Sequence, residues 1–437
     1  MKLIRDFLNS KYFIILTYLV ALVCWRFQTQ IPAIIYSGMA IILIIIFDAK
    51  RIGLITIIFA GIINYRDTAY ETNFWPLLIV GGIVAPFTIY DLVRRKASFK
   101  DPIFIALALY LLANIISLIN ITKENLNYGL VGILQTLAFC FLYFYVQNTK
   151  EEGDYRRVAE SAVYMLLTIA LQVLIFLLTY EGEVLGKNIV LGWSASNSLA
   201  MVFMLLFPMT VFLYVEKEKY YILPLIVVNI ALVVLTLSKG AYLTLALLLI
   251  PLLVFVYKYV KDKRKLTKSL IIMFALALLA FGIIFSISGI REGIVKYLQQ
   301  MSARGWFNDQ ARIRIYKYGA EVFKEFPLFG SGSYTAKPYL IAYGYSPSLK
   351  HYHNFIIQNV ATLGLFGLVT FGNFIVQIFR KIKGGNFYHL SVFFATLAML
   401  IHGLVDNTWH NPVIFVIILI YLAALDATQN KLTSIAK

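Results

Sequence analysis

The chain has 437 residues, of which 60% are hydrophobic and only 14% are charged, and its formal net charge is +17. Soluble domains are about 45–50% apolar and about 25% charged, so this composition excludes a soluble globular fold and indicates an integral membrane protein. A basic chain can bind nucleic acid, but here the cations fall mostly in short loops between apolar segments, a pattern that reports membrane orientation. We therefore expect membrane lipid around the chain and no nucleic acid partner.

Apolar segments recur along the whole chain, and about 20 apolar residues cross a bilayer as a helix. The third segment is the shortest, and the turn between the ninth and the tenth consists only of Ser238-Lys239-Gly240. We predict an all-α polytopic membrane protein with about 12–14 transmembrane helices. The candidate spans are residues 11–27, 30–47, 52–64, 74–92, 102–119, 130–146, 160–179, 193–215, 220–237, 239–259, 269–289, 353–379, 389–406 and 411–427.

Lysine and arginine recur in every second short loop, as in residues 94–100, 150–157 and 258–268. Cytoplasmic loops carry such an excess of positive charge, so both termini are predicted to be cytoplasmic. The polar segment 290–350 then faces the outside, where long segments are exempt from the charge rule. The chain divides, within one membrane domain, into membrane helices at 1–289, an external loop at 290–352, which is the first candidate for catalysis, and C-terminal membrane helices at 353–437.

The external segment is predicted to contain a helix that Asn308-Asp309 caps and that runs to about Phe326. Helical spacing places Arg312 on the same apolar face as Tyr316, whereas Arg314 falls on the solvated side. A cation that points toward the membrane domain is costly without a partner. Arg312 therefore needs an anionic group, which is either a carboxylate in a structural ion pair or a substrate.

The span after the external segment begins at His353-Asn354, shortly after His351. A helix N-terminus favours anions, and a histidine placed there donates to a phosphate or moves a proton. The alternative is a structural histidine at the membrane interface. His351 lies nearer the loop and is the weaker functional candidate.

Further polar residues are predicted to gather at the outer end of the membrane helices. Lys239 lies in its turn close to the hydrocarbon boundary, where a lysine either snorkels to the interface or has a function, because an unpaired cation is costly there. Trp193 and Asn197 open one span from outside, and Asp406 closes another. Since polar groups in lipid must find partners, we expect these residues to line an outward-facing cavity.

The order of several short motifs resembles that of the O-antigen ligase/O-antigen polymerase superfamily. Each motif is weak alone, but their order, spacing and common side of the membrane agree with the family over residues 190–410. The arginine usual in the family's Ser-Arg-Gly turn is Lys239 here, and the tryptophan usual four residues after its loop arginine is Tyr316. The motifs are Trp193 with Asn197-Ser198-Leu199-Ala200, Leu237 to Leu243, Arg312 with Tyr316, Phe326 to Gly332, His353-Asn354, Gly364 to Gly367, and His402 with Asp406-Asn407.

This resemblance implies a metal-independent membrane glycosyltransferase that needs no cofactor. It would move a glycan from a polyprenyl (undecaprenyl) diphosphate carrier to a glycan or lipid acceptor outside a bacterial cytoplasmic membrane. Arg312 and Lys239 would neutralise the leaving diphosphate, although lysine lacks the bidentate binding of arginine. His353 would act on the acceptor hydroxyl as a general base or orienting group, with Asp406 orienting His353 or a cation. The resemblance assigns substrate contacts to Asp406, Asn197, Trp193, Asn354 and Tyr316.

The sequence leaves two alternatives open. Within the family, a polymerase extends another carrier-linked repeat unit, whereas a ligase uses a lipid A core, a teichoic-type acceptor or a protein; the lack of a second domain slightly favours a polymerase. Outside the family, the alternative is a lipid-linked oligosaccharide flippase or another transporter, which the missing repeat symmetry disfavours. The sequence has no Walker A loop and no His/Cys metal cluster, so ATP-driven or metal-dependent chemistry is not expected.

Overall fold

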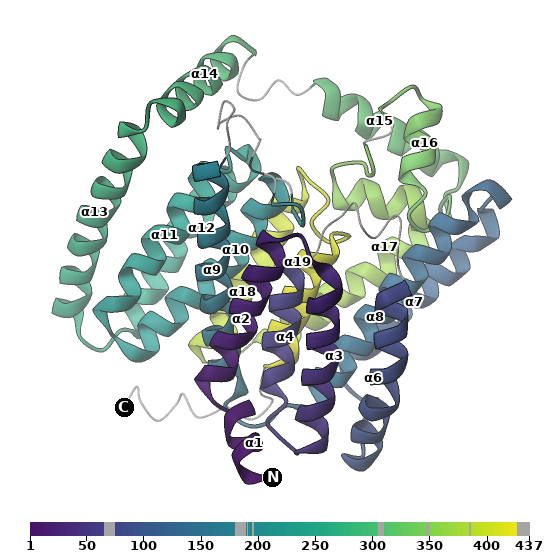
Figure 1. Ribbon diagram of the computed structural model, residues 1–437. Helices are drawn as coiled ribbons and strands as arrows, with labels where there is room; N and C mark the ends of the chain where they lie inside the picture. The colour runs from purple at the N-terminus through teal and green to yellow at the C-terminus, as the bar shows by residue number, and fades with distance from the viewer. Residues whose placement is uncertain are drawn as a thin grey trace.

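The computed structural model describes residues 1–64, 75–179, 189, 191–194, 196–304, 310–346, 349–383 and 386–425. Within them every regular element is helical, and the helices pack into a bundle (Figure 1). The predicted all-α polytopic membrane fold is confirmed. The helices are α1 (Lys2–Leu8), α2 (Lys11–Arg26), α3 (Gln30–Ile46), α4 (Ile52–Ile62), α6 (Trp75–Arg94), α7 (Pro102–Ile116), η1 (Ser117–Asn120), η2 (Lys123–Asn125), α8 (Leu126–Thr149), α9 (Asp154–Thr179), α10 (Ser196–Lys217), η3 (Tyr220–Ile222), α11 (Leu223–Leu235), α12 (Lys239–Tyr259), α13 (Lys263–Ser286), α14 (Ser288–Arg304), α15 (Gln310–Glu325), α16 (Ala336–Ala342), α17 (Phe355–Ile382), α18 (Phe387–Gly403) and α19 (Pro412–Ala423).

Helix length limits the number of membrane spans. Among the described residues, 7 helices are long and apolar enough to cross a membrane, or 8 if α1 and α2, which meet at a bend of 62°, form one span. Five more apolar helices are shorter: α3, α4, α18, α19 and α11 together with η3. Each predicted span coincides with a helix, but the predicted number of 12–14 exceeds the number that qualifies by length. The apolar runs continue past the helix ends into turns, so the runs overstate the helices.

Helix α4, the third predicted span, is too short to cross a bilayer alone. Its 11 residues extend about 16 Å, whereas the hydrocarbon layer is about 30 Å thick. Most of its side chains are buried, and it packs against α2, α3 and α9. It therefore acts as a buried element of the bundle.

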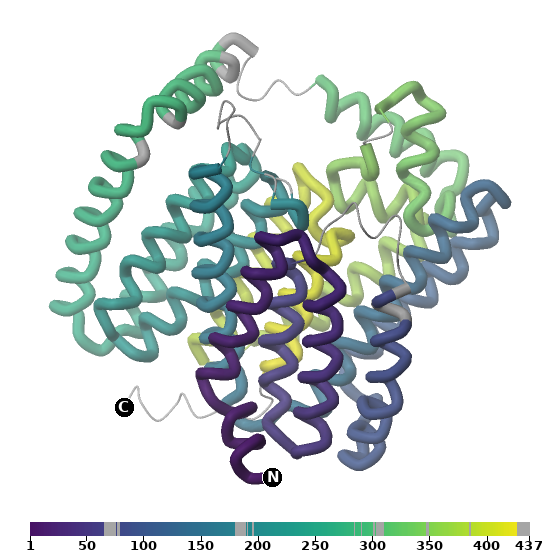
Figure 2. Tube along the Cα trace, in the orientation of Figure 1, coloured from purple at the N-terminus to yellow at the C-terminus, as the bar shows by residue number. Residues whose placement is uncertain are grey.

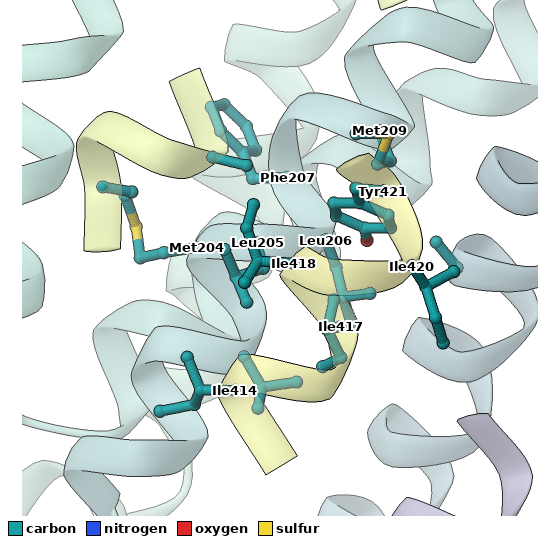
Figure 3. Packing of buried hydrophobic residues seen from close by; sticks show 14 of the residues in the cluster. Met204, Leu205, Leu206, Phe207, Met209, Ile414, Ile417, Ile418, Ile420 and Tyr421 are labelled. Atoms are coloured by element: carbon teal, nitrogen blue, oxygen red, sulfur yellow. The ribbon is translucent and has the colours of Figure 1, made fainter. Parts of the chain in front are cut away.

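Helix α10 forms the centre of the molecule. Its side chains are buried on every side, and it packs against α9, α11, α18 and α19. In Figure 3, Leu205 and Leu206 of α10 lie against branched side chains and Tyr421 of α19. A helix that is apolar all round belongs in such a position. This packing gives the functional groups at the helix ends a rigid support.

Loops that alternate along the chain meet at one end of the bundle. Lys50, after α3, lies 3.7 Å from Glu151, after α8, and Lys381 of α17 lies 2.9 Å from Asp101 at the start of α7. Figure 1 places α1 at this end and α14, α15 and α16 at the opposite end. This arrangement agrees with the alternation that the loop charges predicted. The assignment of this end to the cytoplasm stays a prediction.

The described part of the external segment carries three helices. Helix α14 starts at Ser288 and continues from the peripheral α13, as the tube in Figure 2 shows. The helix predicted to end near Phe326 is α15, which ends at Glu325. Its predicted cap, Asn308-Asp309, lies outside the described residues. The short α16 follows, and α15 and α16 both pack on α17, so the segment is anchored to the membrane domain through α17.

Candidate functional site

The turn after α15 interlocks with a break in α17. The backbone amides of Ser331 and Gly332 donate to the carbonyls of residues 361 and 362, both at 3.0 Å. In the opposite direction the amides of residues 365 and 366 donate to the carbonyls of residues 327 and 328, at 2.9 and 3.1 Å. At the break Gly364 has φ 66° and ψ −163°. Four backbone hydrogen bonds thus tie the external segment to the first part of α17.

The face of α15 that packs on α17 contains Ile315, Gly319 and Val322. The buried face is thus shifted by one residue from the predicted apolar face, which contains Tyr316. Gly319 allows the shift because it lets α17 approach closely: a Cβ there would lie 2.3 Å from Ile357. Arg312 lies half-buried at the margin of this face, and Arg314 is exposed. The predicted difference between the two arginines is therefore present in the structure.

His353 is fixed by its neighbours just before α17. Its φ of 53° lies in the left-handed region, which non-glycine residues rarely adopt. The Tyr316 hydroxyl donates to the carbonyl of His353 at 3.1 Å. Asn354 caps α17 through its side-chain oxygen and donates from its amide nitrogen to the carbonyl of Leu404 at 2.8 Å. Strained backbone of this kind clusters at functional sites and persists where neighbours over-determine it.

The side chain of His353 pairs with that of Asp406, although 53 positions separate them. The Nδ1 atom of His353 lies 3.0 Å from Oδ1 of Asp406, which also accepts from the backbone amide of Asn407 at 2.7 Å. Burial raises the pKa of the Asp406 carboxyl, but the hydrogen bond from His353 and the nearby imidazoles outweigh it and hold the pKa well below its usual range. Asp406 is therefore ionised and directs the Nε2 atom of His353 away from itself.

His351 lies against this pair, with its ring centroid 4.3 Å from that of His353. Burial, helped by the charge of His353, lowers the pKa of His351 to about 4, so its imidazole is neutral at pH 7. Ligand atoms of His351, His353 and Asp406 all lie within 4.8 Å of one another. The sequence shows only a His-x-His pair here, because Asp406 comes from a distant loop.

The turn that carries Lys239 is attached to the same loop through His402. The hydroxyl of Ser238 caps α12 and lies 3.4 Å from Nε2 of His402. The carbonyl of His402 in turn accepts from the amide of Asp406 at 3.0 Å. A Cβ at Gly240 would lie 3.0 Å from the His402 ring, so glycine permits this approach. His402 thus couples the Lys239 turn to the His353–Asp406 pair.

Arg312 acts on the same region from α15. Its positive charge contributes to lowering the pKa of His351 and opposes the rise in the pKa of Tyr297, which is caused by burial. The Tyr297 hydroxyl in turn donates to the carbonyl of Leu237, just before the Lys239 turn, at 2.9 Å. Three segments that are distant in the sequence therefore bring Arg312, Lys239 and His353 to one end of the bundle.

Comparison with known families matches residues 224–372 to a family described as O-Antigen ligase. The resemblance to the O-antigen ligase/O-antigen polymerase superfamily is confirmed. A comparison with curated proteins gave no significant match. We refer to residues 224–372 as the O-antigen ligase region. It contains Lys239, Arg312, Tyr316, His353 and Asn354. It is shorter than the range 190–410 over which the sequence resembles the family.

Three predicted site residues lie outside the O-antigen ligase region. Asp406 is joined to it through His353. Trp193 is buried, and its indole nitrogen donates to Gln172 of α9 at 3.0 Å, so its polar atom is used within the core. Asn197 is half-buried in the first turn of α10, beside Ser198, whose hydroxyl accepts from the Asn411 side chain at 3.0 Å. The structure thus joins the first turn of α10 to the loop after Asp406 through Ser198, the neighbour of Asn197, and leaves Trp193 in the core.

The structure gives partners to His410, which the sequence places with Asp406 at the outer end of a span, and adds Tyr110 and Asn359, which sequence patterns did not single out. His410 lies 2.8 Å from the Asn407 side chain through Nδ1 and 3.1 Å from the Tyr110 hydroxyl through Nε2. The same hydroxyl donates to Asn359 of α17 at 2.9 Å. These buried polar groups fix the loop that follows Asp406. The contacts of the Tyr110 hydroxyl join positions 300 and 249 residues apart, so spacing within the sequence gives no signal for them.

Proposed function

We propose that the protein is a membrane glycosyltransferase, which moves a glycan from a polyprenyl diphosphate carrier to a glycan or lipid acceptor. The observation that supports this most is the pair of His353, within the O-antigen ligase region, and Asp406, outside it, with Nδ1 of His353 3.0 Å from the carboxylate. A carboxylate that holds one nitrogen of an imidazole leaves the other nitrogen to accept a proton. This is the geometry of a general base.

In the proposed reaction, His353 Nε2 takes the proton of the acceptor hydroxyl while its oxygen attacks the anomeric carbon of the glycan. The bond between that carbon and the diphosphate oxygen breaks, and polyprenyl diphosphate leaves with the bonding electrons. Arg312 and Lys239 neutralise the charge that develops on the diphosphate. Asp406 stabilises the imidazolium and keeps the ring oriented.

The proposed site faces the outside of a bacterial cytoplasmic membrane. The loop charges place residues 94–100 and 258–268 in the cytoplasm, and the Lys239 turn lies at the other end of α12. Both termini are then cytoplasmic. Carrier-linked glycan would reach the site from the outer leaflet, within the outward-facing cavity that the sequence predicts.

Mass spectrometry of carrier lipids from a strain that lacks the gene tests this proposal. We favour a polymerase, for which single repeat units should accumulate on the carrier outside the membrane. Full-length chains on the carrier would instead identify a ligase. Carrier-linked units that stay on the inner leaflet would contradict glycan transfer and identify a flippase. Complementation with the intact gene, but not with a His353→Ala gene, should restore the normal lipids.

Arg312 and Arg314 offer a matched test of the electrostatic role. Arg312→Ala is expected to lower glycan transfer by roughly 10²–10³-fold, the range for removing one group that stabilises developing charge. Arg314→Ala removes the same charge from an exposed position of the same helix and should leave transfer within about twofold of wild type, because surface substitutions have small effects. The measurement is transfer of a carrier-linked glycan by purified protein in detergent. Equal effects of the two substitutions would refute the assignment.

A further inference from the structure

The cluster of His351, His353 and Asp406 contains one imidazole that the proposed reaction leaves without a role. Ligand atoms of the three residues lie within 4.8 Å of one another, and all three side chains are half-buried. The set combines two imidazoles with one carboxylate. Solvent can therefore reach a compact group of three metal-ligating side chains at the place where the reaction is proposed to occur.

The chemistry of these donors selects among metal ions. Two nitrogens and one oxygen suit Zn²⁺ and similar transition metals, whereas Mg²⁺ and Ca²⁺ prefer oxygen ligands. Tetrahedral Zn²⁺ with bonds of about 2.0–2.1 Å to nitrogen needs ligand atoms about 3.4 Å apart. The present separations of up to 4.8 Å would have to shorten by about 1.4 Å on metal binding, and the fourth position stays open for water or an oxygen of the substrate.

Two of the three ligands are already held in place. The Tyr316 hydroxyl fixes the backbone of His353, and the Asn407 amide fixes the carboxylate of Asp406. Supporting hydrogen bonds of this kind orient ligands and raise metal affinity. The backbone amide of His353 also donates to Nδ1 of His351 at 3.3 Å, which sets the orientation of the third ligand. Arg312 lies near enough to act on His351, and its charge opposes a bound cation, so we expect moderate rather than tight binding.

We propose that His351, His353 and Asp406 form a Zn²⁺ site whose occupation blocks glycan transfer. The inhibition of glycan transfer rests on the proposed function, because Zn²⁺ would coordinate the imidazole of His353 and the carboxylate of Asp406, which serve as base and orienting group. Binding itself does not depend on that function. His351 would then be the residue that makes the active site sensitive to zinc.

Isothermal titration calorimetry of the full chain in detergent with ZnCl₂ tests the site directly. We expect one saturable site in the wild type, no heat of binding with MgCl₂, and a roughly 10–100-fold weaker Zn²⁺ affinity in His351→Gln. The matched control is His389→Gln, which removes an imidazole at the other end of the helix that precedes Asp406 and should bind as wild type does. No saturable binding, or equal affinity in wild type and His351→Gln, would overturn the site.

Transfer assays with ZnCl₂ then test the block. Zn²⁺ should inhibit the wild type, and His351→Gln should keep its transfer without added metal while needing roughly 10–100-fold more Zn²⁺ for the same inhibition. Zn²⁺ that binds in calorimetry without affecting transfer would overturn the block. A wild type that transfers no glycan even without Zn²⁺ would count against the proposed function, while calorimetry still decides the site.

Discussion

His353→Ala is expected to lower glycan transfer by roughly 10²–10⁴-fold, the usual contribution of a positioned general base. The substitution removes the nitrogen that accepts the acceptor proton, and no carboxylate can replace it, because Asp406 is directed at the missing ring. Transfer of a carrier-linked glycan to its acceptor by purified protein is the measurement. Size-exclusion chromatography of the variant should match wild type, because the side chain of His353 is half-buried at the margin of the bundle.

Asp406→Asn tests, in the same assay, how much the charge of Asp406 contributes to the function of His353. The amide keeps the shape of the side chain but loses the charge that stabilises the imidazolium, so transfer should fall markedly while the acceptor KM changes little. His351→Gln is the control, since it removes the neighbouring imidazole and leaves the His353–Asp406 pair intact. Wild-type transfer in His353→Ala would end the assignment of a base, and a loss in His351→Gln as large as in His353→Ala would move the role to His351.

Patterns in the sequence located the helices because membrane helices consist of continuous apolar runs. The same patterns separated Arg312 from Arg314, since helical spacing decides which side chain faces the bundle. They located the break between two apolar runs near Lys239, although the turn lies at residues 236–238, two residues before the predicted Ser238-Lys239-Gly240, and Lys239 begins α12. Local spacing was sufficient in each of these cases.

The contacts that assemble the site are not local. His353 meets Asp406 across 53 positions, and His402 reaches Ser238 across 164. Trp193 has the sequence position of an interfacial aromatic residue, but its indole nitrogen finds Gln172 on the neighbouring helix and the side chain is buried. Which distant polar partner satisfies a buried group depends on helix packing, which no periodicity encodes.

The break in α17 was also invisible to the apolar pattern. The run 353–379 reads as one helix, and the Pro327–Gly332 stretch alone reads as an ordinary turn. In the structure the two glycine motifs form one interlocked unit, since Gly330 and Gly364 each face the backbone of the other segment. The reason for both motifs becomes clear only when they are seen together.

Gly364→Ala is accordingly expected to destabilise the protein more than any other small substitution in α17. A Cβ at this position would lie 2.4 Å from the carbonyl carbon of Leu328, in a backbone with φ 66°. With ψ −163° this backbone is essentially restricted to glycine and alone costs roughly 1–3 kcal/mol for a residue with a side chain, and the clash forces the interlock apart in addition. We expect a lower melting temperature in detergent and a loss of glycan transfer, because the interlock sets how α15, which carries Arg312, packs on α17.

Two further glycines separate the causes of this effect. Gly344→Ala has a similar φ of 84° with open space around the added methyl group, and Gly372→Ala lies in α17 with open space and helical backbone. Gly344→Ala should therefore lose only the conformational part, and Gly372→Ala should be neutral or slightly stabilising, since alanine favours helix over glycine by up to about 1 kcal/mol. Gly330→Ala, whose Cβ would lie 2.2 Å from the backbone of residues 362 and 363, should match Gly364→Ala. If Gly364→Ala melted like Gly344→Ala, backbone strain alone would explain the glycine, and the interlock would not be what fixes α15, which carries Arg312, against α17.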